Sequence, residues 1–315
     1  MRILSLLALL VMPGVAVAQP AQEEFADGAP AGDGRSAVFR LAPRALHYFS
    51  TDLDDDATDT GDVAVSRFGA LASLDIPVGS VSTITFAGEF TFSAYDFDGT
   101  GIFEEDNQLL SEAFEAGLGV TWSSRLGDHW TYFVGGGGRI SGESGADVSD
   151  AVTGRAFGGI GYRFSERLSL GGGVGVSTQL DDDTLVVPIF TVFYQPHDDW
   201  ILSAGGGPAA AGRVLGATLT WQPQPDLGLS LTGAWDRRQF RLDDDGPIVD
   251  GIATDSRVDI ILGVNWGITE HIILRVEGGV SLAQEYEFDD ADGDSVLDSE
   301  ADATPFIGGS ITFEF

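Results

Sequence analysis

Residues 81–95 read VSTITFAGEFTFSAY, and apolar and polar side chains alternate along this stretch. Positions 84, 86, 90 and 92 hold Ile or Phe, whereas positions 83, 85, 89, 91 and 93 hold Thr, Glu or Ser. A period of two residues is that of a β-strand, which points successive side chains to opposite faces. The stretch therefore predicts a strand with one apolar and one polar face.

The same alternation recurs along the chain, clearly in residues 110–122 and 258–268. Most segments run for ten residues or more, which fits the roughly 9–11 residues of a tilted membrane strand better than the about 5–6 of a soluble one. We count about fourteen segments, near residues 37–49, 63–76, 81–95, 109–122, 130–141, 152–164, 168–180, 184–194, 199–205, 213–222, 227–242, 256–268, 272–286 and 304–315. The weak alternation in 184–194 and 199–205 leaves twelve strands as the alternative.

Short and long connections alternate between these segments. Short turns are expected at residues 77–80, 125–128, 165–167, 196–199, 223–225 and 269–271, and Trp122, Trp130, Trp200, Trp221 and Trp266 lie beside them. Short periplasmic turns, long extracellular loops and aromatic girdles are typical of outer-membrane barrels. The alternative is a soluble β-protein with ordinary core tryptophans. The pattern favours an all-β fold: a transmembrane, antiparallel, up-and-down β-barrel.

The first residues have the features of an export signal. Arg2 is followed by an apolar stretch and then by Ala16-Val17-Ala18, an A-x-A cleavage site. The sequence thus predicts a signal peptide at 1–18, a flexible lead-in at 19–36 and the barrel at 37–315.

Composition excludes several classes of function. The 315 residues include 49 acidic and 16 basic residues, for a net charge of -33. This acidity argues against nucleic acid as a partner, because such a site needs a basic face. The chain has no Cys, which excludes disulfides and thiol catalysis.

The charges separate by position along the predicted strands. Loops 50–62, 96–108, 141–151, 181–183, 243–255 and 287–303 hold 30 of the 49 acidic residues and no arginine. The polar phase of the strands instead holds arginines mixed with carboxylates. We predict that the pore is lined by Arg40, Arg44, Arg67, Glu89, Glu115, Arg139, Arg155, Arg238, Arg275 and Glu277, and the same phase holds Asp75, Arg163, Asp236, Arg257, Asp259 and Glu314.

Two interpretations of this lining remain open. Arginine and carboxylate rows can select solutes in a water-filled pore, or they can pair and fill a narrow barrel. A barrel of about fourteen strands is wide for side chains alone to fill, which favours the pore. Polar-phase glycines at 135, 137, 171, 173 and 175 are expected to leave space or to receive long arginine side chains.

The chain ends in FIGGSITFEF, with Ile307, Gly309, Ile311, Phe313 and Phe315 on one face. This tail resembles the last strand of Gram-negative outer-membrane β-barrel proteins, and PIFTVFYQPHDDW resembles an uncharacterised family of outer-membrane barrel domains. The resemblance implies an outer-membrane location, contact with its lipid, and recognition of Phe313 and Phe315 by the barrel-assembly machinery. It implies a fold but no activity.

One acidic loop has the spacing of a calcium site. Carboxylates at alternate positions can wrap several oxygens around Ca²⁺, and the stretch resembles a thrombospondin type 3 calcium repeat. The resemblance implies Asp290, Asp292, Asp294 and Asp298 as ligands. Ser295 replaces the usual Gly and Ala301 stands where an EF-hand has its bidentate Glu, so a solvated acidic loop is the alternative.

Catalysis is not expected. His47 is the one histidine away from the short turns, and the sequence pairs it with no serine or second histidine. The predicted function is a porin-like channel for passive diffusion of small hydrophilic solutes. The alternative is a non-conducting structural or surface-interaction barrel with acidic loops, with or without calcium.

Overall fold

The computed structural model describes residues 36–54, 60–100, 109–181, 184–205 and 214–315. The predicted signal peptide and nearly all of the predicted lead-in lie outside the described residues. Within the described ranges, no helix is long and apolar enough to cross a membrane.

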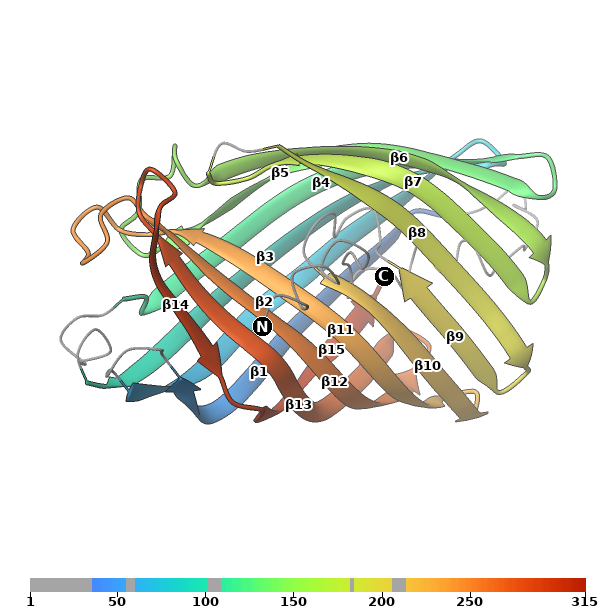
Figure 1. Ribbon diagram of the computed structural model, residues 1–315. Coiled ribbons are helices and arrows are strands. Elements are labelled where there is room, and N and C mark those ends of the chain that lie inside the picture. Colours follow the sequence, from blue (N-terminus) through green and yellow to red (C-terminus); the bar gives the residue numbers. More distant parts are fainter. Residues whose placement is uncertain (1–35, 55–59, 101–108, 182–183, 206–213) are drawn as a thin grey trace.

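The described chain is built of β-strands (Figure 1). They are β1 (Val38–Asp54), β2 (Thr60–Val78), β3 (Ser82–Gly99), β4 (Glu112–Leu126), β5 (Trp130–Glu143), β6 (Val152–Ser165), β7 (Leu168–Thr178), β8 (Thr184–His197), β9 (Trp200–Gly205), β10 (Val214–Gln224), β11 (Leu227–Arg241), β12 (Ile252–Thr269), β13 (Ile272–Asp289), β14 (Ser295–Ala301) and β15 (Thr304–Glu314).

The strands form one closed barrel. Each of β1 to β13 pairs antiparallel with the next strand, and β15 closes the barrel between β13 and β1. The short β14 pairs with β13 and β1 beyond the end of β15. The prediction of fourteen barrel strands is confirmed, and both weakly alternating segments are strands. The strand β14 was not predicted, because residues 287–303 were assigned wholly to a loop.

Two β-bulges change which side chains point inward. In β13 the register shifts opposite Ser256 and Val258, and Ala283 adopts a left-handed φ of 46°. On the short-turn side of this bulge Arg275 and Glu277 face the lumen, whereas on the long-loop side Tyr286 and Phe288 face it. A second shift in β1, between Tyr48 and Thr51, turns Leu53 inward.

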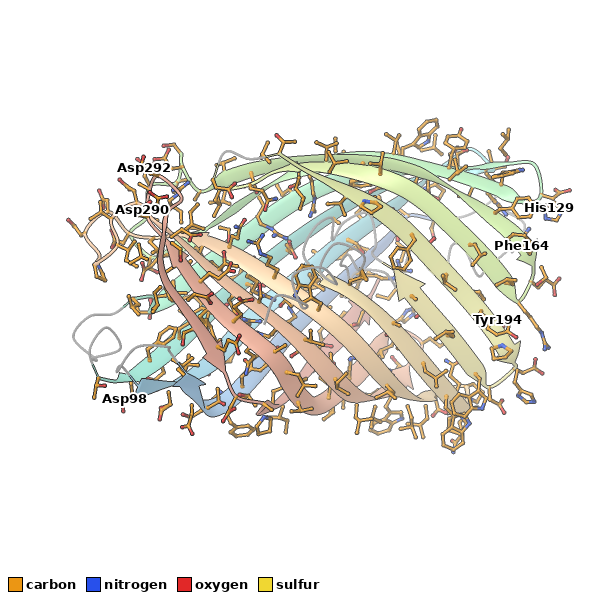
Figure 2. All side chains as sticks on the ribbon, in the orientation of Figure 1. Asp98, His129, Phe164, Tyr194, Asp290 and Asp292 are labelled. Carbon is orange, nitrogen blue, oxygen red and sulfur yellow. The ribbon has the colours of Figure 1, made fainter. Side chains whose placement is uncertain are left out.

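These redirected residues fill the loop end of the barrel. A buried apolar cluster there comes mainly from β1, β2, β3, β11, β12 and β13 and includes Leu53, Val63, Val65, Leu110, Phe240, Tyr286 and Phe288. Figure 2 labels Asp98, Asp290 and Asp292 at this end, and His129, Phe164 and Tyr194 at the opposite, short-turn end.

A direct contact between β5 and β11 narrows the same end. Gly142 and Arg241 form a parallel bridge, and Ser141 Oγ donates to the carbonyl oxygen of Gln239 at 2.5 Å. The guanidinium of Arg241 donates to the carbonyl oxygens of Asp150, Leu180 and Asp250. At this level the lumen is therefore enclosed by fewer strands than lower in the barrel.

Candidate functional site: the barrel lumen

The ten predicted lining residues lie on the inner face of the strands. Cross-strand register places Arg44, Gly69, Thr91, Glu115 and Ser141 in one row on neighbouring strands, so their side chains share a face. The alternate residues of the same strands, including Phe68 and Phe90, are about half exposed on the outside. The alternation of apolar and polar residues therefore distinguishes the inner from the outer face of these strands where no bulge intervenes.

The half of the lumen toward the short turns is polar and keeps contact with solvent. Arg40 bonds Asp75 at 2.6 Å and Glu314 at 2.7 Å, and Arg275 bonds Glu277 at 2.6 Å. Arg139 bonds Glu89 at 2.8 Å. The seven charged side chains of these pairs are all between 18% and 41% exposed. We call this region the inner half of the lumen.

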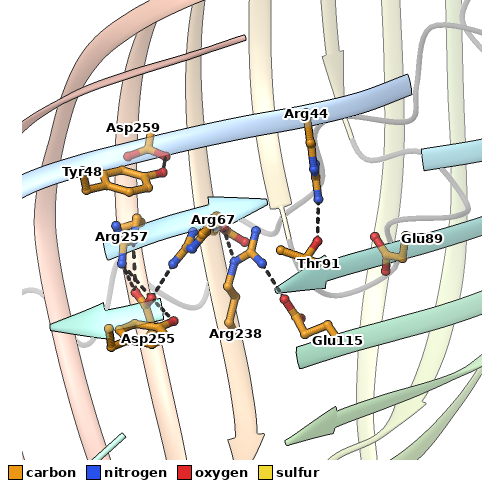
Figure 3. Close-up of polar contacts among 12 residues, drawn as sticks. Arg44, Tyr48, Arg67, Glu89, Thr91, Glu115, Arg238, Asp255, Arg257 and Asp259 are labelled. Atoms are coloured by element: carbon orange, nitrogen blue, oxygen red, sulfur yellow. Dashed lines mark hydrogen bonds and ion pairs between the residues drawn. The ribbon is translucent and has the colours of Figure 1, made fainter. Parts of the chain in front are cut away.

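A layer of buried polar side chains crosses the lumen above the inner half (Figure 3). Arg67 of β2 bonds Asp255 of β12 at 2.5 Å and Asp236 of β11 at 3.3 Å. Arg238 of β11 bonds Glu115 of β4 at 2.5 Å. We name this set the cross-lumen layer; it consists of Tyr48, Arg67, Tyr95, Glu115, Asp236, Arg238, Asp255, Arg257, Asp259 and Tyr286.

Asp255 is the centre of this layer. Its carboxylate accepts from Arg67, from Arg257 at 2.6 Å and from the Tyr95 hydroxyl at 2.8 Å. The ring of Tyr48 lies under both guanidiniums, 4.2 Å from Arg257 Cζ and 5.2 Å from Arg67 Cζ. Arg257 is 0% and Asp255 2% exposed, so the centre of the layer is sealed from solvent.

One member of this layer lies elsewhere than its sequence position predicted, and three others had no predicted role. Asp255 was assigned to the extracellular loop 243–255, but it lies inside the barrel at the end of that range. The tyrosines 48, 95 and 286 were not predicted as site residues. Alternation gave no signal for Tyr286, because the bulge at Ala283 reverses the phase of β13.

The lumen thus has two parts with different character. The bond from β4 to β11 joins opposite sides of the barrel, and the bond from β2 to β12 joins strands four positions apart around it. The apolar cluster lies beyond these bonds. The inner half resembles the predicted pore, whereas the outer end resembles the alternative in which paired charges fill the barrel.

Glycines on the inner wall of β5 and β6 accommodate aromatic rings. A Cβ at Gly135 would lie 2.5 Å from Cζ of Phe157, and a Cβ at Gly159 would lie 2.5 Å from Cζ of Phe133. These two rings, rather than arginine side chains, occupy the space that the glycines leave. Of the two expectations for the polar-phase glycines, open space or a long arginine side chain, Gly135 shows space that the Phe157 ring occupies.

The outer face of the barrel carries a broad apolar belt. Large apolar side chains there are strongly exposed, among them Leu118 at 74%, Leu262 at 65% and Val186 at 58%. Exposed apolar area on this scale is unfavourable in water but is the normal surface of a barrel in lipid. Trp122, Trp130, Trp200, Trp221 and Trp266 lie exposed near the short turns.

This closed barrel has the apolar outer face and the aromatic girdle that are typical of outer-membrane β-barrels. In barrels of that kind the short turns face the periplasm, and the inner half of the lumen lies at the short-turn end.

Solved outer-membrane proteins have similar folds. A FadL homologue from Pseudomonas aeruginosa is 11% identical, with a TM-score of 0.49 and 91% of this chain and 93% of that chain covered. The toluene transporter TodX from P. putida is 8% identical, with a TM-score of 0.49 and coverages of 95% and 92%. A Rhodopseudomonas blastica porin variant is 9% identical, with a TM-score of 0.34 and coverages of 89% and 100%. These similarities concern the fold alone.

Neither sequence comparison gives a match. No protein-family model matches the chain, and no curated protein matches it.

The four predicted calcium ligands lie in a turn and a strand. Asp290 Oδ1 accepts from the backbone N–H groups of Asp292 and Asp294, both at 3.0 Å. Asp298 lies in β14, in register with Glu287 of β13. The calcium site stays a prediction.

A different acidic loop brings three carboxylates together. Asp243, Asp244 and Asp245 each offer an oxygen, and these oxygens lie within 4.8 Å of one another. The pKa of the Asp244 carboxyl is raised because its hydrogen bond with Asp243 and the charge of Asp245 favour the protonated form. Exposed acidic groups of this kind are common on protein surfaces without an ion.

His47 has a serine partner that the sequence did not reveal. Its Nδ1 lies 2.9 Å from Ser66 Oγ on the outer face, and its ring meets Phe49 edge-on. Hydrolysis would also require donors for an oxyanion. Both strands are paired on both sides here, so their N–H groups bond within the sheet.

Proposed function

We propose that this outer-membrane barrel is a channel for small hydrophilic solutes that is closed at its outer end. The observation that supports this function is the contrast along the lumen. The inner half is lined by solvent-contacting arginines and carboxylates, as suits a polar passage. The cross-lumen layer blocks the straight route, so passage requires that it opens.

The proposal modifies the simple diffusion pore expected from the sequence. A steadily open pore would need a continuous wet path, whereas here ion pairs with side chains at most 10% exposed span the lumen. Such pairs are strong only while they are complete, since removing one partner leaves a buried charge. We therefore infer a resting state in which polar side chains close the channel.

Osmotic swelling of liposomes containing the refolded protein tests the proposal. We expect slow swelling in small sugars with the unmodified chain and much faster swelling with Glu115→Ala/Arg238→Ala, which removes both partners of one cross-lumen pair. The matched control is Arg167→Ala/Asp198→Ala, an exposed pair at 2.5 Å in the short turns, which should change nothing. No swelling with either the unmodified or the opened protein would refute the channel and favour the non-conducting structural barrel.

A second candidate is transport of an apolar solute, and one observation favours it. The inner face of β5, β6 and β8 presents Phe133, Phe157, Val187 and Ile189 beside small glycines. This wall offers an apolar surface that the wall from β1 to β3 lacks. Uptake of a small aromatic hydrocarbon into the same liposomes, without uptake of sugars, would favour this candidate.

A further inference from the structure

Glu143 is a buried carboxylate at the outer end of the barrel. It is the last residue of β5, two positions beyond the row of Ser141 and Glu115, and it is 7% exposed. Its Oε1 accepts from the N–H of Ser111 in the β3–β4 connection, and its Oε2 accepts from the N–H of Asp243 in the β11–β12 connection, both at 3.2 Å. One side chain therefore ties two connections to the end of β5.

Arg241 makes the same kind of tie from β11. It is the last residue of this strand, and its guanidinium donates to the carbonyl oxygens of Asp150, Leu180 and Asp250 in the β5–β6, β7–β8 and β11–β12 connections. Gly142, next to Glu143, forms the parallel bridge with Arg241. We call Glu143 and Arg241, with the five backbone groups that they bind, the outer clasp.

The connections pack closely at the outer clasp. Gly145 has a φ of 117°, and a Cβ there would lie 2.7 Å from Asp243 Cγ. A Cβ at Gly142 would lie 3.3 Å from the carbonyl oxygen of Arg241 and 3.5 Å from the Cβ of Ala151, which is 1% exposed. Ala151 is therefore enclosed where the β5–β6 connection packs against β5 and β11.

The neighbours of Glu143 are mostly acidic. The carboxylate of Asp243 lies against Gly145, while the guanidinium of Arg241 bonds carbonyl oxygens. Within the described part of the chain, Glu143 forms no ion pair, and its partners are backbone N–H groups. The other charged residues on the elements around it are Asp96, Glu112, Asp147, Asp150, Asp181, Asp244 and Asp245.

This environment favours the protonated form of Glu143. β5 runs 14 residues from Trp130, more than the roughly 9–11 of a tilted membrane strand, so its last residue lies beyond the membrane span. Burial raises the pKa of the Glu143 carboxyl, the two N–H donors lower it in part, and the charge of Asp243 raises it further.

Separation of the clasp changes this pKa. A Glu143 side chain released into water has the ordinary pKa of a glutamate, so the closed clasp is the form with the higher pKa. The form with the higher pKa binds the proton more tightly. Acid therefore favours the closed clasp, and this preference is lost as the pH rises through the raised pKa.

We propose that the outer clasp is a proton-responsive closure of the channel: protonation of Glu143 in acid holds the outer connections together, and its ionisation at neutral pH loosens them. This regulation rests on the proposed channel. The response of the clasp itself can be measured without passage of a solute.

The absence of cysteine from the chain makes a direct test possible. In the refolded protein in liposomes, Ala151→Cys places a single thiol under the clasp. Val148→Cys, at a position 52% exposed in the same connection, is the reference that corrects for the change of thiol reactivity with pH. We expect a maleimide to label Ala151→Cys, relative to this reference, at least about threefold more slowly at about pH 5 than at about pH 7.

Three substitutions in the Ala151→Cys background identify the group responsible. Glu143→Gln removes the charge and keeps an acceptor oxygen, so labelling should be slow at both pH values. Glu112→Gln, at an exposed acid that begins β4, is the matched control and should keep the response of the unmodified clasp. Arg241→Gln removes the three bonds to carbonyl oxygens and should make labelling fast at both pH values. Heat-modifiability on gels confirms that each variant folds.

The outcomes separate the clasp from the channel. A labelling ratio that does not change with pH, or a response that persists in Glu143→Gln, overturns the role of Glu143 whether or not the barrel conducts. Slow labelling of the Arg241→Gln variant at both pH values overturns the clasp. A response lost in Glu143→Gln and kept in Glu112→Gln supports the clasp, and if that barrel passes no solute, the channel alone is refuted.

Discussion

At the scale of single residues, Asp255 is the carboxylate on which most of the cross-lumen layer depends. Asp255→Ala removes the acceptor of Arg67, Arg257 and Tyr95 and leaves two buried guanidiniums without it. We expect a loss of about 3–5 kcal/mol in the free energy of unfolding. Urea titration followed by tryptophan fluorescence measures this loss, and Asp98→Ala should cost under about 0.5 kcal/mol. Equal midpoints for the two variants would contradict the layer's structural role.

Ala283 lies at the bulge that determines which residues of β13 point into the lumen. A left-handed φ costs an L-residue about 1–2 kcal/mol, which glycine does not pay. Ala283→Gly should therefore raise the free energy of unfolding or leave it unchanged, and Ala283→Val should lower it by at least about 1 kcal/mol, both measured from the urea midpoint. A midpoint that rises with Val would show that β13 has no bulge there.

Ala283 also divides the residues of β13 whose orientation the sequence could predict from those whose orientation it could not. Alternation placed Arg275 and Glu277 in the lumen, because no bulge separates them from the rest of the pattern below Ala283. It could not place Tyr286 inward, since a bulge adds one residue without a mark in the hydrophobic pattern. The bonding of Asp255 to Arg67, 188 residues away, has no local signal at all.

At the scale of elements, Phe315 follows β15 directly and extends the pairing of this strand with β1. Phe39 N–H donates to the Phe315 carbonyl oxygen at 3.1 Å, Phe315 N–H donates to the Phe39 carbonyl oxygen at 2.9 Å, and the two rings stack at 6.0 Å. Deleting Phe315 should lower the amount of heat-modifiable barrel in the outer membrane, both by loss of this closure and by loss of the residue that we propose the assembly machinery recognises. Export should be unaffected. An unchanged amount of inserted barrel would contradict both roles.

The connection between β13 and β14 is where we propose calcium binding. Millimolar Ca²⁺, the range typical of extracellular modules, should protect the connection from a protease that cleaves beside aspartate, the one acidic residue type in residues 290–294. Asp292→Ala and Asp294→Ala should remove the protection, and Asp244→Ala should not. If only Asp244→Ala loses the protection, calcium binds at Asp243–Asp245 instead. If Mg²⁺ protects the connection as well as Ca²⁺ does, the effect is charge screening and not a calcium site.

Elements were easier to predict than their ends. Long alternating runs identified all fourteen barrel strands, including β8 and β9, whose alternation is weak. The acidic run that contains β14 concealed a strand, because its exposed positions carry Asp298 and Glu300 and its inward ones carry Leu297 and Ser299. The many acidic residues of this stretch indicated a loop, and the alternation of apolar and polar positions was too short to indicate a strand.

At the scale of the whole molecule, the lumen is divided by contacts that no single strand encodes. Strand number and polar phase predicted a wide, charged interior, and the inner half agrees. The closure of the outer end depends on β2 meeting β12, β4 meeting β11 and β5 meeting β11. These contacts join walls that are distant in the strand order, so they depend on the shape of the closed barrel.

Single-channel recording in planar bilayers tests the divided lumen most directly. The unmodified protein should be closed for most of the recording, and Glu115→Ala/Arg238→Ala should open often and to a higher conductance, with the Arg167→Ala/Asp198→Ala control behaving like the unmodified protein. Large, steady conductance steps from the unmodified barrel, equal to those of the Glu115→Ala/Arg238→Ala variant, would show that the cross-lumen layer does not close the channel.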